Sequence, residues 1–237
     1  MKNKKNNAEA LSAISKDRQR TNLLRKGEQK LIAYLVQRIP SWMGSDGLSV
    51  IGFIGNVLVA SSFVIALFFG RNWLLISLLG FVINWFGDSL DGRIAYYRNK
   101  PRKWYGFSLD ITIDWIGTFL IGLGFSIYSQ DWGEIFGFLF VVMYGWEMLT
   151  ALLRYKIAGK YSIDSGIFGP TEVRILIALI ILSEVIVPGL MKYLVGIACV
   201  ILFVSNIIET RHVLDMGDEK DAEERKMKED AEGNTQK

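Results

Sequence analysis

Long apolar segments alternate with short polar connections along this chain. Six of the segments have the length and hydropathy of membrane-spanning helices, and they lie at about residues 48–70, 72–95, 107–128, 133–155, 171–188 and 190–211. A bilayer core about 30 Å thick is crossed by roughly 20 apolar residues in a helix, and the first segment contains no charged residue. The pattern therefore predicts an all-α fold, a polytopic integral membrane helical bundle with six transmembrane helices.

Polar segments flank this predicted six-span domain of residues 46–212. Residues 1–30 form a basic arm that contains nine Lys and Arg but only three Asp and Glu. Residues 31–45 mix apolar side chains with Gln37 and Arg38, which predicts an interfacial amphipathic helix in the headgroup layer. Residues 213–237 carry charges of both signs and few apolar side chains, which predicts a solvated, frayed helix or a disordered tail.

The cations of the connections follow the alternation of the predicted spans. Residues 93–103 contain five Lys and Arg and residues 154–160 contain three, whereas the other connections contain one or none. Because cytoplasmic loops carry the excess of Lys and Arg, this asymmetry predicts that both termini and both cationic loops lie in the cytoplasm. An even number of spans agrees with that orientation.

Composition narrows the possible chemistry. The 237 residues are 51% hydrophobic and 22% charged, and the mean hydropathy of +0.26 is too high for an ordinary soluble domain. One cysteine, Cys199, and one histidine, His212, exclude disulfide frameworks, Cys/His metal sites and Ser-His-Asp triads. Acid–base chemistry must therefore use carboxylates. The chain contains no Walker loop or dinucleotide fingerprint, and no nucleic-acid partner is expected.

Four aspartates lie near the cytoplasmic ends of the second and third predicted spans. Asp88 and Asp91 are three residues apart, and Asp110 and Asp114 are four apart, so each pair lies on one face of its helix. Acids inside a membrane segment are costly unless they are paired or functional. Two divalent cations, Mg²⁺ or Mn²⁺, would neutralise them, and such a pair of ions clamps the attacking and leaving oxygens of a phosphoryl transfer.

Two glycines adjoin the acidic pairs. Gly92 follows the first pair and Gly106 precedes the second. Their missing side chains would let a nucleotide approach the backbone. The basic connection between the two pairs would balance the charge of a diphosphate.

The acidic motif resembles the signature of the CDP-alcohol phosphatidyltransferases, integral membrane enzymes that make phospholipid head-group linkages and release CMP. The matching pattern in this chain is Asp88-x2-Asp91-Gly92-x2-Ala95 followed by Gly106-x3-Asp110-x3-Asp114. The likeness covers about residues 40–210 and includes the six spans. It implies a CDP-linked donor, a lipid substrate or product, a homodimer, and an active site that faces the cytoplasm, as at a bacterial inner membrane.

The resemblance also implies roles for the residues of the motif. Asp88, Asp91 and Asp110 would hold the metals. Asp114 would complete the metal site and act as the catalytic general base on the acceptor hydroxyl. The residues that would bind the cytidine nucleotide are Asp88, Asp91, Gly92, Ala95 and Gly106.

One part of the chain departs from the family pattern. The family has Ala-Arg, then eight residues, then Gly, whereas here Tyr96 follows Ala95 and nine residues precede Gly106. Arg93 or Arg98 would then have to replace the missing arginine.

The direction of transfer stays open. Residues 39–56 and 169–174 resemble, more weakly, segments of choline and ethanolamine phosphotransferases, which would pair a CDP-aminoalcohol donor with a lipid hydroxyl. Those enzymes carry a histidine after the third aspartate, where this chain has Ile111. The reverse arrangement, with CDP-diacylglycerol as donor and a small polar alcohol as acceptor, is the commoner bacterial pattern in the family.

Further charged residues are candidates for contact with the substrate phosphate or head group: Arg93, Arg98, Arg102, Arg154 and Glu172. Arg98, Arg102 and Arg154 could instead act only as determinants of topology. Glu172 could form a helix-end pair with Arg174.

Two other functions compete with the transferase. A cation transporter could use the four aspartates as its ion site, but that function would place acids near the midplane on broken helices. Here the acids lie near the cytoplasmic ends, beside a basic connection. A catalytically silent member of the family is the other alternative. Only an enzyme would lose turnover with Asp114→Asn.

Overall fold

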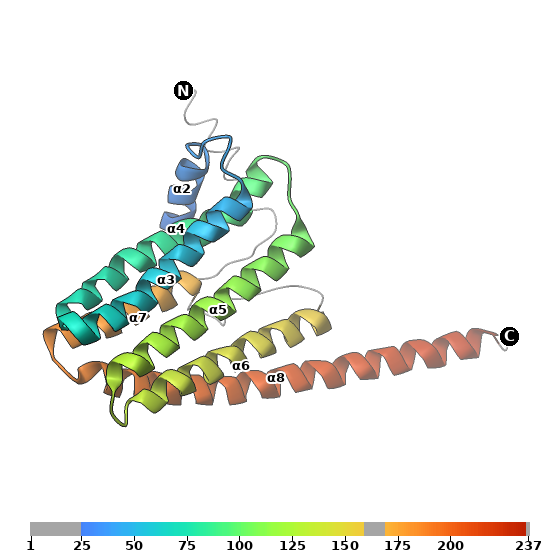
Figure 1. Ribbon diagram of the computed structural model, residues 1–237. Coiled ribbons are helices and arrows are strands. Elements are labelled where there is room, and N and C mark those ends of the chain that lie inside the picture. Colours follow the sequence, from blue (N-terminus) through green and yellow to red (C-terminus); the bar gives the residue numbers. More distant parts are fainter. Residues whose placement is uncertain (1–24, 159–168, 236–237) are drawn as a thin grey trace.

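A computed structural model describes residues 25–158 and 169–235 of the chain. Every regular element within these ranges is a helix (Figure 1), which confirms the predicted all-α class. The elements in chain order are α2 (Arg25–Val36), α3 (Ser45–Phe69), the short 3₁₀ helix η1 (Arg71–Leu75), α4 (Ile76–Tyr97), α5 (Lys103–Ser129), α6 (Glu134–Ala158), α7 (Pro170–Ile186) and α8 (Leu190–Thr235).

Five helices among the described residues are long and apolar enough to cross a membrane: α3, η1 with α4, α5, α6 and the larger part of α8. They coincide with five of the predicted spans and support a multi-pass membrane protein. The remaining predicted span, residues 171–188, corresponds to α7. This helix has 17 residues, the short end of the range for a spanning helix, so the count of six stays a prediction.

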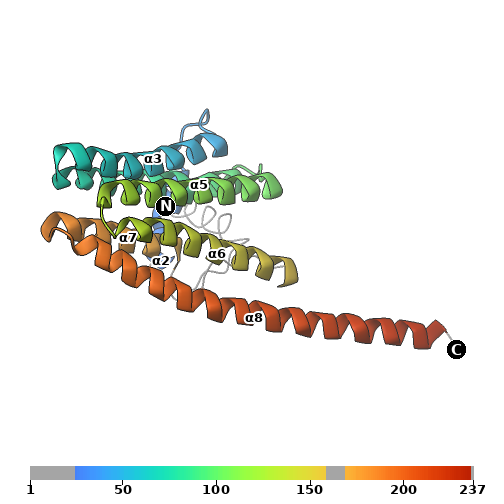
Figure 2. The same cartoon turned by 60° about the horizontal axis from the view of Figure 1, so that its bottom comes forward.

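The long helices run alongside one another (Figures 1 and 2), and their contacts form a closed ring. Contacts run from α4 through α3, α5 and α6 to α8, and α7 returns from α8 to α4. The helix α8 continues beyond the others on one side of the bundle (Figure 1). Residues from α4, α5 and α7 can therefore converge even though they are far apart in sequence.

The helix before the first span differs in its bounds from the expected residues 31–45. It occupies Arg25–Val36 and packs through Ile32 and Val36 on α3 and α4. Pro40 disfavours helical backbone at the residue before it, so the chain turns at residues 37–44. The guanidinium of Arg98 holds this turn by donating to the carbonyl oxygens of Met43 at 2.6 Å, Pro40 at 2.9 Å and Ile39 at 3.1 Å.

The charged tail is a continuation of the last span. Helix α8 runs without a break to Thr235, so the expected boundary at residue 213 falls inside a helix. Opposite charges four residues apart, such as Asp221 with Arg225, support helix in a polar segment. The ammonium of Lys220 also donates to the carbonyl of Ile157 at 3.0 Å, which ties the start of the tail to α6.

Helices α3 and α4 cross with their backbones in contact. A Cβ atom added at Gly87 would lie 2.2 Å from the amide nitrogen of Gly52, and one added at Gly55 would lie 2.4 Å from that of Asn84. Only glycine permits this approach, as in other membrane helix pairs that meet through small residues. Because Gly87 directly precedes Asp88, the crossing determines where that aspartate lies.

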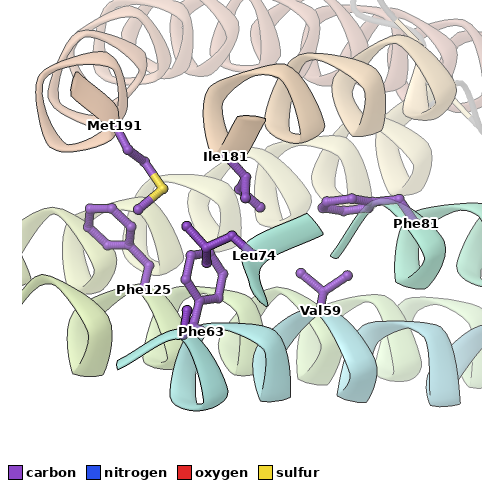
Figure 3. Close-up of a cluster of buried hydrophobic side chains, with 8 residues drawn as sticks. Val59, Phe63, Leu74, Phe81, Phe125, Ile181 and Met191 are labelled. Carbon is purple, nitrogen blue, oxygen red and sulfur yellow. The ribbon is translucent and has the colours of Figure 1, made fainter. Parts of the chain in front are cut away.

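A buried apolar cluster joins α3, α4 and α5 to η1, α7 and α8 (Figure 3). Its members include Val59, Phe63, Leu74, Phe81, Phe125, Ile181 and Met191. The rings of Phe63 and Phe125 meet edge to face with centroids 6.3 Å apart, a favourable arrangement for aromatic pairs. Ile181 brings α7 into this cluster, so the ring is closed by packing as well as by polar contacts.

We predict that Gly87→Ala destabilises the protein because the added methyl group overlaps the α3 backbone. Overpacking of this kind costs about 1–3 kcal/mol or more, so the thermal unfolding temperature in detergent should fall. Gly27→Ala is the matched control, since a Cβ atom there meets nothing within 4 Å. Equal unfolding temperatures for the two variants would contradict the close crossing.

Candidate active site

The four predicted aspartates meet in one pocket. They lie on α4 and α5, and α3 supplies part of the wall. The lining residues are Ser49, Gly52, Asn84, Asp88, Asp91, Asp110, Ile113 and Asp114. The structure thus brings together two acidic pairs that the sequence separates by a whole connection.

Three of the carboxylates converge closely enough to hold a metal ion. Asp88, Asp110 and Asp114 each offer one oxygen, and these oxygens lie within 4.8 Å of one another. The local reason is helical periodicity, because Asp110 and Asp114 are one turn apart on α5 and so project from the same face. Carboxylate oxygens are the ligands that Mg²⁺ and Mn²⁺ prefer, so the donor set fits a hard divalent cation.

Asp91 lies in the same pocket but outside that group of three oxygens. Its carboxylate accepts a hydrogen bond from the hydroxyl of Ser49 at 2.7 Å and another from the backbone N–H of Gly92. Ser49 belongs to α3, so this bond connects α3 to the acidic end of α4. A ligand set of all four aspartates stays a prediction.

Arg174 joins the candidate site through Asp88, a contact that the sequence did not predict. It lies in the second turn of α7, and its guanidinium donates to a carboxylate oxygen of Asp88 at 2.5 Å. Both side chains are largely buried, with exposures of 15% for Arg174 and 22% for Asp88. The sequence does hold a signal for this pair, because an arginine inside an apolar segment needs a carboxylate partner. The partner expected from the sequence was Glu172, not Asp88.

Glu172 has a different contact. Its carboxylate accepts the backbone N–H of Gly169 at 3.1 Å, which satisfies one of the free amides at the start of α7. The helix dipole also stabilises a negatively charged side chain in the first turn. The contact shown for Glu172 is therefore a helix cap, and a role toward the head group stays a prediction.

The other predicted cations also make structural contacts. Arg98 binds the turn at residues 37–44, and Arg102 forms an exposed ion pair with Asp46. Arg154 pairs with Glu209 of α8 at 3.0 Å. Arg93 is buried in α4, with 6% of its surface exposed. The expectation that Arg98 replaces the arginine missing at Tyr96 stays a prediction.

Gly92 and Gly106 border open space. A Cβ atom added at either position would meet no atom of the described residues within 4 Å. Packing inside this chain therefore does not require glycine there, in contrast to Gly87. A nucleotide that approaches the backbone needs such space beside the acids. Its approach to Gly92 and Gly106 stays a prediction, and so does its contact with Ala95.

Comparison with known proteins identifies a family. The sequence model of the family described as CDP-alcohol phosphatidyltransferase matches residues 48–205, more than half of the 237 residues. The matched region includes the four aspartates and Arg174. A search of curated proteins finds no match.

We predict that purified protein binds Mn²⁺ and that Asp110→Asn weakens this binding by about tenfold or more, because one of three converging charged ligands is lost. Electron paramagnetic resonance of Mn²⁺ in a titration measures the affinity. Asp215→Asn is the control, since Asp215 is an exposed aspartate of α8. Equal affinities in the two variants would rule out the carboxylate cluster as the metal site.

Proposed function

Because the chain belongs to the CDP-alcohol phosphatidyltransferase family, its general activity is phospholipid head-group transfer, and we propose that it moves a substituted phosphate from a CDP-linked donor to a hydroxyl acceptor and releases CMP. The observation that carries this proposal is the convergence of carboxylate oxygens from Asp88, Asp110 and Asp114 within a membrane bundle. The reaction breaks the bond between phosphorus and the oxygen of CMP and forms one to the acceptor oxygen.

The aspartates would bind two divalent cations, Mg²⁺ or Mn²⁺, with Asp91 completing the set. When bound, such ions supply charge for the diphosphate and for the departing CMP oxygen. Asp114 would accept the proton of the acceptor hydroxyl, since carboxylates are the available acid–base groups. Ser49 holds the carboxylate of Asp91 in a fixed direction, and Arg174 does the same for Asp88.

Open backbone at Gly92 and Gly106 would accommodate the cytidine nucleotide, with Ala95 on the same helix as Gly92. The basic side chains near this end of the bundle, Arg93 and Arg102 among them, would add positive potential for a diphosphate. These assignments rest on the motif and on the free space beside it.

The proposed topology has six spans, with α7 as the fifth in chain order. Both termini and the pocket would then face the cytoplasm, because the connections on their side carry the excess of Lys and Arg that is typical of cytoplasmic loops. We propose a bacterial inner membrane as the location. A homodimer is carried over from the resemblance alone.

Two substrate pairings fit this proposal. One is CDP-diacylglycerol with a polar alcohol, and the other is a CDP-aminoalcohol with a lipid hydroxyl. The deciding experiment measures CMP released by purified protein in liposomes with Mn²⁺ or Mg²⁺, for each pairing separately. CMP from one set would give the direction of transfer.

The two alternatives receive less support. Both helices that carry the acids, α4 (Ile76–Tyr97) and α5 (Lys103–Ser129), are continuous through the acidic positions, whereas an ion site of a transporter favours discontinuous helices. A catalytically silent member would have little reason to keep four half-buried acids on membrane-spanning helices, which are costly without a function.

We expect Asp114→Asn to lower CMP release by about 10²-fold or more, the usual contribution of a general base. Asp215→Asn on α8 is the control and should leave the rate unchanged. Turnover by Asp114→Asn at the wild-type rate would remove the proposed base. No CMP from any pairing with the wild-type protein would favour the silent alternative.

Arg174→Lys and Arg174→Ala form a graded pair. Lysine keeps the charge but not the planar fork that matches a carboxylate, so CMP release should fall about tenfold, whereas alanine removes the charge from a largely buried pair and should cost about 10²-fold. Arg225→Ala, in the tail of α8, is the matched control. Full activity of Arg174→Ala would show that the ion pair with Asp88 is dispensable.

A further inference from the structure

Glu28 is a carboxylate of α2 that points into the bundle. It is 7% exposed, and it begins the buried face that continues with Ile32 and Val36, each 1% exposed. A carboxylate on such a face costs free energy unless hydrogen-bond donors meet it. An apolar side chain at position 28 would have extended the apolar face of Ile32 and Val36, whereas a glutamate at this position needs polar partners.

Two donors to Glu28 come from other helices. Trp85 of α4 donates its indole N–H to Oε1 of Glu28 at 3.3 Å. Thr171 of α7 donates its hydroxyl to the same oxygen at 2.8 Å, across 143 positions of sequence. A carboxylate oxygen can accept two such bonds at once, so Glu28 connects α2, α4 and α7 at a single point.

Both donors lie one helical turn from residues of the candidate active site. Trp85 is three residues before Asp88 on α4, and Thr171 is three residues before Arg174 on α7. Asp88 and Arg174 are themselves paired. The same two helices are therefore joined twice, once directly by the ion pair and once through Glu28.

We propose that Glu28 is a positioning residue that acts through Thr171 to hold the first turn of α7, and with it Arg174, against Asp88. Its effect on turnover rests on the proposed function, whereas its hold on α7 does not. The role is distinct from metal or nucleotide binding, because Glu28 lies outside the residues that line the pocket. It makes α2 a support of the active site as well as a helix packed on the bundle.

The first measurement is hydrogen exchange of the backbone amides at the start of α7. Glu28→Ala removes the acceptor, and Thr171→Val removes the donor while keeping the shape of the side chain. Both variants should exchange about tenfold faster in this turn, since local opening follows the loss of a local restraint. Glu28→Gln keeps an acceptor oxygen and should exchange like the wild type. Glu134→Ala, at an exposed acid of α6, is the control.

The second measurement is the kinetics of CMP release. Glu28→Ala should lower kcat about tenfold with KM changed less than about twofold, because a displaced Arg174 affects the reacting geometry more than ground-state binding. Glu28→Gln should restore most of the rate. In an Arg174→Lys background, Glu28→Ala should cost less than about twofold more, since two residues that act on one contact are not additive.

Unchanged exchange in both Glu28→Ala and Thr171→Val would overturn the proposal whatever the activity. Fully additive losses with Arg174→Lys would overturn the route through Arg174. If the wild-type protein released no CMP, the proposed function would fail, and the exchange result would still decide whether Glu28 holds α7.

Discussion

The gathering of four half-buried aspartates in one pocket of an apolar bundle is the constraint on which the rest of the structure depends. Carboxylates in a low-dielectric setting repel one another and are poorly solvated. Arg174 brings one guanidinium from α7 to Asp88. The oxygens of Asp88, Asp110 and Asp114 converge within 4.8 Å of one another, and carboxylate oxygens are the ligands that hard divalent cations prefer.

The arrangement of these charges is set by parts of the bundle that carry no charge. Backbone contact at Gly87 and Gly55 fixes the crossing of α3 and α4, and Asp88 is the next residue after Gly87. The apolar cluster around Phe63 and Ile181 closes the ring through α7 (Figure 3). The site is thus positioned by helix packing, and small displacements of a helix would move a charged side chain directly.

Much of the fold and the centre of the site could be predicted from local pattern. The spans follow from hydropathy, and the pairing of Asp110 with Asp114 on one face follows from helical periodicity. The partners of the long cationic side chains could not be predicted in this way. The partners shown for Arg98 and Arg154 lie 55 to 59 residues away in sequence, in a turn and on α8, and their contact with substrate stays a prediction. Residue type alone does not reveal such a partner.

The sequence by itself determined the membrane class, the helical fold and the acidic faces, because transfer free energy and periodicity act on neighbouring residues. Only the tertiary structure decided that Arg174 meets Asp88 and that Glu28 begins a buried face of α2. The physical reason is that these features depend on contacts between distant residues and on the closure of the helix ring. A single arginine or glutamate in a pattern of spans does not encode which helix will pack beside it.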